Sequence, residues 1–215
     1  MDSVARFIHQ RARLGFPGRT IVYCSTIAHT CTIAGILGCE SFFSNQADQD
    51  GILERFRTGP GKVLVATNAL GMGIDIPDIR SVIHLGWPRT MLDYGQESGR
   101  AGRDGQPSEA IIVQPEGFHK PPIWFQLPVG ADEKQVQLYE ADITLVQDYL
   151  DTPLSGCRRA VLDAYLDGDF DGRTRTHCGD SIAQGLDEQR CDRCQPSWYV
   201  SSYEPTPSIP WGRGD

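Results

Sequence analysis

A single stretch, residues 62–105, constrains the fold and the chemistry of this chain more than any other part of it. The apolar, β-branched run at 63–66 predicts a buried strand, and a second buried strand is expected at 81–85. Between them, Gly71 and Gly73 flank one methionine, and Asp75 follows in what should be a tight loop. Because glycine has no Cβ atom, this backbone can bring its N–H groups close to a ligand.

Two arginines, Arg100 and Arg103, close the stretch in a glycine-rich setting. The guanidinium group keeps its positive charge and matches phosphate oxygens with two parallel hydrogen bonds. Taken singly, each part has a simpler interpretation: a solvated basic turn for the arginines, and a carboxylate that caps a turn for Asp75. Their order within one short segment instead favours a phosphate-binding site.

The first half of the chain alternates between strands and helices. Beyond the two strands above, the pattern predicts strands at 19–26, 39–44 and 109–113 and helices at 2–14, 27–37 and 48–56. This order predicts an α/β fold with a doubly wound, mainly parallel sheet. Ser25 follows a strand at the edge where such sheets bind ligands, although Ser25 and Thr26 together more often begin a helix. Cys24, Cys31 and Cys39 are expected to be buried thiols.

Two motifs in the chain resemble those of a known family. The run VLVATNALGMGIDIPDIRSVIHLGWPR, followed by YGQESGRAGRDG, is similar to motifs V and VI of superfamily-two helicases, and specifically of the RecQ family of DNA helicases. The resemblance covers most of the chain. It implies the second of two RecA-like motor domains at 1–115 and a helical zinc-binding subdomain at 116–195. Beyond it, repeated prolines and the lack of periodicity predict a flexible tail at 196–215.

The resemblance also implies roles for residues around a bound nucleotide. Arg103 is expected to be the arginine finger that completes an ATP site, with Arg100 as its partner in phosphate or interdomain contacts and Gln96 as a polar relay. Gly73 and Asp75 would lie beside the nucleotide.

A further set of residues is expected to contact DNA. By the same resemblance, Thr67, the backbone near Gly71 and, at the end of its strand, Ser25 would touch the phosphates of a single strand or a duplex junction. Hydroxyl and N–H donors suit recognition that does not depend on base sequence.

Four late cysteines form the last chemical constellation: Cys157, Cys178, Cys191 and Cys194. The C-x-x-C pair at 191–194 is a common half-site for tetrahedral zinc, and a predicted helix at 157–166 followed by cysteines resembles the RecQ zinc subdomain. Relatives usually space the last cysteines more closely. The alternatives are four unrelated thiols or a redox pair, which normally opens a helix after a strand. We expect one structural Zn²⁺ on the four cysteines, with His177 outside the site.

The printed sequence contains no Walker A loop and no apolar run that ends in Asp-Glu as a Walker B strand does. We therefore expect half of a motor, inactive alone, that uses ATP and Mg²⁺ only with a first RecA-like motor domain in the same chain or another. The predicted function is the carboxyl-terminal half of an ATP-dependent 3'-5' DNA helicase. The alternative is a non-catalytic helicase remnant that binds nucleic acid or protein through its zinc subdomain.

Charge and hydropathy limit the partners further. The formal net charge of -8 argues against attachment to nucleic acid by bulk electrostatics, so any DNA contact must be local. No apolar run approaches the ~20 residues of a membrane span, and the amino terminus lacks the apolar core of a signal peptide. The expected location is intracellular, in a nucleus or in bacterial cytoplasm.

Overall fold

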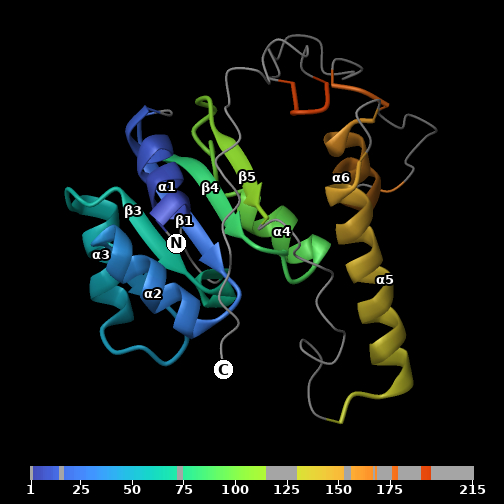
Figure 1. Ribbon diagram of the computed structural model, residues 1–215, viewed down its shortest axis with the longest axis horizontal. Helices are drawn as coiled ribbons and strands as arrows, with labels where there is room; N and C mark the ends of the chain where they lie inside the picture. Colours follow the sequence, from blue (N-terminus) through green and yellow to red (C-terminus); the bar gives the residue numbers. More distant parts are fainter. Residues whose placement is uncertain are drawn as a thin grey trace. The chain divides into compact units, whose positions relative to one another are not determined.

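Five parallel strands form one sheet from the apolar runs of the first half of the chain (Figure 1). They are β1 (Arg19–Cys24), β2 (Glu40–Phe42), β3 (Val63–Ala66), β4 (Ile79–Leu85) and β5 (Glu109–Val113), arranged in the order β2-β3-β1-β4-β5. Every residue of β1 and β4 is buried, as expected for central strands that are covered on both faces. The predicted doubly wound, parallel α/β fold is confirmed.

The computed structural model describes residues 2–14, 17–71, 75–114, 130–152, 156–166, 168, 176–178 and 190–194. These residues fall into two compact units. The sheet unit comprises the described residues within 2–89 and 96–114, and the helical unit comprises those within 90–95 and 130–194. The predicted tail at 196–215 lies outside the described residues, as do the proline-rich connector at 115–129 and residues 179–189 between two of the cysteines.

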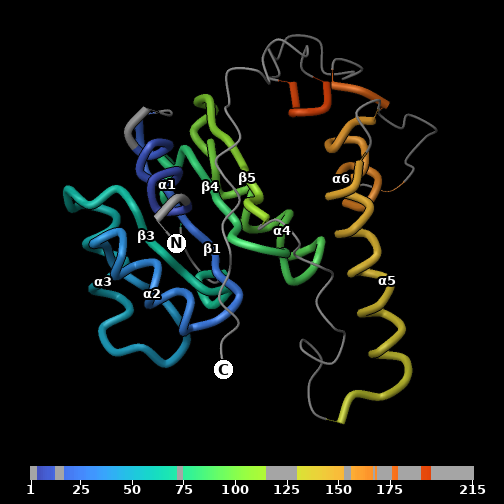
Figure 2. The backbone as a smooth tube through the Cα atoms, viewed as in Figure 1, coloured from blue at the N-terminus to red at the C-terminus, as the bar shows by residue number. Residues whose placement is uncertain are grey.

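The two faces of the sheet are covered by different helices. The helices of this half are α1 (Asp2–Leu14), α2 (Ile27–Leu37), α3 (Gln49–Thr58) and α4 (Met91–Ser98), and η1 (Asn68–Gly71) is a short 3-10 turn. Because side chains alternate along a strand, Ile21 and Tyr23 of β1 pack on one face with α3, and Val22 and Cys24 pack on the other with α1 and α2. Figure 2 traces the backbone through these strands and helices.

Helix α2 begins and ends where its flanking residues can satisfy the backbone. The side chain of Thr26 accepts a hydrogen bond from the His29 N–H (3.2 Å), which confirms the predicted helix cap after β1. Gly38 ends the helix in the left-handed conformation (φ 64°), where its missing Cβ atom removes the steric cost.

The prediction of three buried thiols is wrong for Cys31, which is exposed, and Cys39 is only half-buried. Cys24 is buried, and burial raises its pKa to about 12. Apolar residues lie on all sides of helix α2, so its composition does not reveal which face packs on the sheet. The buried positions are Thr30, Ile33, Ala34 and Leu37, and Cys31 lies off that face.

The helical unit contains α5 (Glu133–Leu150), α6 (Arg158–Leu166) and the first residues of α4. Helix α5 starts with a capping box, because the side chain of Asp132 accepts from the Gln135 N–H (2.8 Å) and the side chain of Gln135 accepts from the Asp132 N–H (3.0 Å). Asp142 of α5 accepts from the Met91 N–H at the start of α4 (3.2 Å). None of the described helices is long and apolar enough to cross a membrane.

Candidate nucleotide site and metal centre

The loop after α4 presents Arg103 at the surface. The Arg103 side chain is 40% exposed, and its Nη1 lies 3.3 Å from Oδ1 of Asp75, which is more exposed still. The preceding residue, Gly102, has φ 68° and donates its N–H to the Ile79 carbonyl oxygen (2.9 Å) at the start of β4. A Cβ atom at Gly102 would lie 2.4 Å from Oγ of Ser108, so only glycine fits this turn.

A second anchor holds the loop on the other side of Arg103. Arg80 of β4 donates two hydrogen bonds to the carboxylate of Asp104, at 3.0 and 2.5 Å. These bonds hold the pKa of Asp104 below its usual range. Sequence reasoning did not identify this pair, because its partners lie 24 positions apart and only the sheet brings them together.

Arg100 is placed differently from Arg103. It is 5% exposed, and its Nη2 donates to the carbonyl oxygen of Gly71 at the end of η1 (2.8 Å). The two arginines of the motif therefore differ: Arg100 is buried and bonded to the Gly71 backbone, and Arg103 is partly exposed beside Asp75.

Buried polar groups lie between α4 and the sheet. Nε2 of His84 on β4 lies 2.7 Å from Oε2 of Glu97 on α4, and the His84 ring stacks on Tyr23 of β1 with centroids 5.1 Å apart. Burial raises the pKa of Tyr23 well above its ordinary value, and the charge of Glu97 acts in the same direction. The sequence does not identify His84 and Glu97 as a pair, since a histidine in a strand and a glutamate in a helix give no signal until the fold brings them together.

The residues expected to contact DNA lie at the ends of neighbouring strands. Ser25 follows β1 and is exposed, and Thr67 follows β3, which pairs with β1 in parallel. Thr67 is buried, and its hydroxyl accepts from the Ala69 N–H (3.3 Å) at the start of η1. Gly71 is exposed at the end of that turn.

Two predicted nucleotide-site residues remain. Gln96 is exposed on α4. Gly73 lies outside the described residues, so the site is described only by its flanking positions, Gly71 and Asp75.

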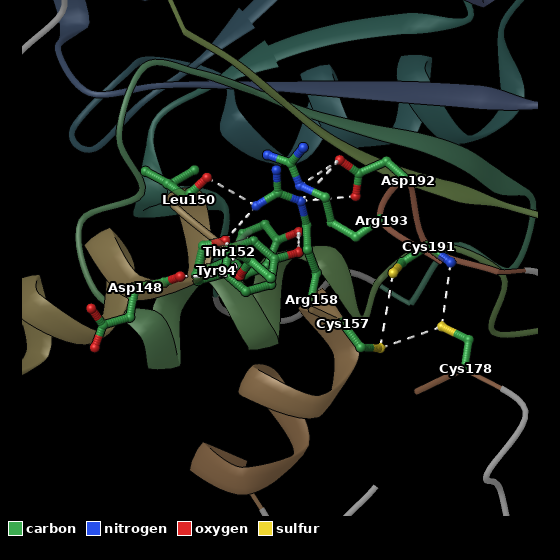
Figure 3. Close-up of polar contacts among 11 residues, drawn as sticks. Tyr94, Asp148, Leu150, Thr152, Cys157, Arg158, Cys178, Cys191, Asp192 and Arg193 are labelled. Carbon is green, nitrogen blue, oxygen red and sulfur yellow. Dashed lines mark hydrogen bonds and ion pairs between the residues drawn. The ribbon is translucent and has the colours of Figure 1, made fainter. Parts of the chain in front are cut away.

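The four late cysteines come together in the helical unit, as the sequence predicted. Their sulfur atoms all lie within 4.8 Å of one another. Sγ of Cys157 is 3.6 Å from that of Cys178 and 3.9 Å from that of Cys191 (Figure 3). In a tetrahedral zinc site with Zn–S bonds of ~2.3 Å, the sulfurs lie roughly 3.8 Å apart. The geometry and the all-sulfur donor set therefore fit Zn²⁺.

The surroundings of the cluster favour the thiolate form of one ligand. Burial acts to raise the pKa of Cys191, but the N–H groups of Arg158, Cys194 and Arg193 outweigh it and lower the pKa to about 7. Burial raises the pKa of Cys178 to about 12. Binding a cation would reverse that cost, because metals bind the thiolate. His177 is exposed beside the cluster and is not one of the four converging ligands.

Comparison with known proteins agrees with this architecture. Residues 3–105 match the family described as "Helicase conserved C-terminal domain". ATP-dependent DNA helicase Q4 of Homo sapiens is 52% identical over 123 residues, which are 54% of this chain and 10% of that protein. The bifunctional 3'-5' exonuclease/ATP-dependent helicase WRN of Mus musculus is 32% identical over 196 residues, which are 84% of this chain and 13% of that protein.

The likeness extends to bacteria and to a solved structure. The probable ATP-dependent DNA helicase RecS of Bacillus subtilis is 40% identical over 126 residues, or 54% of this chain and 25% of that protein. The crystal structure of the E. coli DEAD-box protein SrmB bound to RraA is similar with a TM-score of 0.48 and 24% identity, over 53% of this chain and 71% of that chain.

The sheet unit is thus a helicase carboxyl-terminal domain. With its arginine motif and cysteine-bearing extension, the chain is the carboxyl-terminal helicase region of the RecQ family. It spans 10–25% of the length of the three relatives named above.

Proposed function

We propose that this chain supplies the second motor domain of a RecQ-type, ATP-dependent 3'-5' DNA helicase, and that Arg103 is its arginine finger. The observation that carries the proposal is the placement of Arg103. Its guanidinium is accessible beside Asp75, while Gly102 is bonded to β4 and Asp104 is held by Arg80 on either side of it. A rigid loop with one accessible cation suits the recognition of a phosphoryl group.

The remaining residues of the nucleotide site support Arg103. Asp75 and Gly73 would lie beside the nucleotide, and Gln96 would relay polar contacts from α4. In this proposal Arg100 acts indirectly, because it is buried and holds the Gly71 carbonyl oxygen. When bound by the first motor domain, ATP with Mg²⁺ supplies the phosphoryl group, and Arg103 stabilises the negative charge that develops on it.

The DNA contacts follow the strand ends. Ser25 and the backbone at Gly71 are exposed and would bind phosphates, while Thr67 would hold η1 in place through its bond to the Ala69 N–H. These donors read the backbone and not the bases, so binding would not depend on sequence.

We also propose that Cys157, Cys178, Cys191 and Cys194 hold one structural Zn²⁺. The support is the convergence of four sulfurs at distances that suit a tetrahedral ion. Four protein ligands leave no coordination position for water, so the metal would stabilise the helical unit and take no part in catalysis.

The test of the motor proposal joins this chain to a first RecA-like domain from a RecQ relative and measures phosphate release with single-stranded DNA. The fusion should hydrolyse ATP, and the chain alone should not. Arg103→Ala should lower the turnover of the fusion by ~10³- to 10⁵-fold, and Arg103→Lys should restore little of it, because lysine lacks the planar fork.

The matched control is Arg57→Ala, which removes an arginine from an exposed ion pair with Glu54 on α3. Its turnover should equal that of the unmodified fusion. Near-full turnover of the Arg103→Ala fusion would refute the arginine-finger role. A fusion that binds DNA without hydrolysing ATP would favour a non-catalytic binding module, which the net charge of -8 does not oppose if the contacts are local.

A further inference from the structure

Arg158 connects the cysteine cluster to the end of α5 (Figure 3). Its Nε donates to both carboxylate oxygens of Asp192, at 2.8 and 3.0 Å, and its Nη1 donates to the carbonyl oxygens of Tyr149 and, at 3.1 Å, of Leu150. Both partners of the ion pair directly follow a cysteine of the cluster, since Cys157 precedes Arg158 and Cys191 precedes Asp192. The guanidinium thus joins two ligand-bearing segments to one helix end.

The positive charge of Arg158 is placed favourably for the dipole of α5 but not for that of α6. Arg158 is the first residue of α6, where a positive charge opposes the dipole of its own helix. The same charge is favourable at the carboxyl end of α5, where the last carbonyl groups lack helical partners. Its side chain is 17% exposed and that of Asp192 is 58% exposed, so solvent screens the bonds to the carbonyl oxygens of α5 less than it screens the ion pair. Thr152 adds to the cap by donating its hydroxyl to the carbonyl oxygens of Asp148 (3.0 Å) and Tyr149 (2.8 Å).

From Tyr149 the contacts continue into α4. The guanidinium carbon of Arg158 lies 5.5 Å from the centre of the Tyr149 ring, and the hydroxyls of Tyr149 and Tyr94 are 2.8 Å apart. Both tyrosines are buried, at 9% and 3% exposure. Burial raises the pKa of each hydroxyl, so both stay protonated and one donates to the other.

Helix α4 is the element that leads into the arginine motif. Its first residues, up to Gly95, belong to the helical unit, and its last residues, from Gln96, belong to the sheet unit. Met91, Tyr94 and Glu97 recur every three residues and are all buried. Arg100 and Arg103 follow within six residues of Glu97 in the sequence.

We propose that zinc bound by the four cysteines fixes the first half of α4 through Asp192, Arg158 and the Tyr149–Tyr94 pair. The metal would hold the turn that carries Asp192, and Asp192 would orient Arg158. Arg158 would then stabilise the last turn of α5, which carries Tyr149, through its bonds to the carbonyl oxygens of that turn. These are positioning residues: none would touch zinc, ATP or DNA. The proposal rests on the zinc site proposed above.

The test uses the full chain and measures amide hydrogen exchange of peptides that cover 91–98, with zinc and after chelation, alongside zinc content by mass spectrometry. Removing zinc should speed exchange at 91–98 roughly tenfold or more, within the range that local opening spans. With zinc bound, Tyr149→Phe should speed exchange at 91–98 by a similar factor while exchange at 158–166 stays slow. After chelation, the variant and the unmodified chain should exchange alike at 91–98.

The matched control is Thr144→Ala, which also removes one hydroxyl from α5 but breaks only a bond to the Glu140 carbonyl oxygen of the same helix (2.8 Å). It should leave exchange at 91–98 unchanged. If a thermal melt shows that Tyr149→Phe does not fold, Arg158→Gln carries the same expectation, with Arg57→Gln as its control. Slow exchange at 91–98 in zinc-bound Tyr149→Phe, or no response of the unmodified chain to chelation, would overturn the proposal. A purified chain without zinc would instead refute the metal site itself.

Discussion

The sheet unit and the helical unit hold their structures by different means. In the sheet unit, two clusters of buried apolar side chains lie on opposite faces of β1, β3 and β4, and many of their members are fully buried. In the helical unit, none of the described residues of α6 is buried, and α5 buries Ile143, Val146 and Tyr149. The other described residues that are buried in this unit are Met91, Tyr94 and Thr152 and the two ligand candidates, Cys157 and Cys178. The Zn²⁺ proposed above would, through its coordination, supply in the second unit stabilisation that apolar burial supplies in the first.

The largest expected effect comes from breaking the cysteine cluster. Cys157→Ser, or chelation of the metal, should unfold α5 and α6 while the sheet stays folded, because structural zinc contributes an apparent ~10–16 kcal/mol near neutral pH. Hydrogen exchange should become fast at 133–150 and 158–166 and stay slow at 79–85. Cys31→Ser, at an exposed thiol, is the control. If Cys157→Ser kept both slow exchange and zinc, metal coordination would not be what holds the helical unit.

A smaller effect, this time in the sheet unit, is expected from a substitution in its apolar core. Leu64 is fully buried in β3, so Leu64→Ala should lower the free energy of unfolding of the sheet unit by about 2–5 kcal/mol through lost transfer energy and a cavity. Unfolding by denaturant, followed with a signal from the sheet unit, measures this change in the free energy of unfolding. The zinc content should stay at one equivalent. A parallel loss of zinc would show that the two units do not depend on separate sources of stability.

The smallest effect concerns the ion pair that holds the arginine loop. Because Arg80 lowers the pKa of Asp104, the ionised carboxylate stabilises the folded chain above the unfolded pKa of about 3.9, and this stabilisation is lost only as the pH falls through the lower, folded pKa. The difference in melting temperature between the unmodified chain and Asp104→Asn should therefore be constant from pH 7 to about 4 and shrink below that. A difference that already shrinks between pH 7 and 5 would contradict the pair.

The sequence predicted the elements well where the pattern was regular. Helix α2 and the strands β3 and β5 have the predicted bounds, and the four cysteines converge as expected. These predictions succeed because apolar periodicity and ligand spacing are local signals. The pairs Arg80–Asp104 and His84–Glu97 could not be predicted, since each depends on how a strand and a distant helix or loop come together.

The same limit explains why the sequence does not predict that Cys31 is exposed and that Arg100 is buried. Helix α2 has no polar face to mark the side that meets solvent, so a cysteine in it has no preferred orientation in the sequence. For Arg100, a glycine-rich arginine motif indicates phosphate binding, yet its guanidinium is buried on the Gly71 carbonyl oxygen. Only the fold distinguishes the inward arginine from the exposed Arg103.

The division of α4 between two units has a consequence for anyone who cuts this chain. A fragment that stops at residue 115 would keep the whole sheet but would delete the partners of two buried groups in α4: Asp142, which accepts from the Met91 N–H, and Tyr149, which bonds to Tyr94. The cut would expose the ring of Tyr94 and the first turn of α4 to water, close to the arginine motif in the sequence. In this chain the point at which a fragment can be safely ended is set by helix α4 and not by the last strand of the sheet.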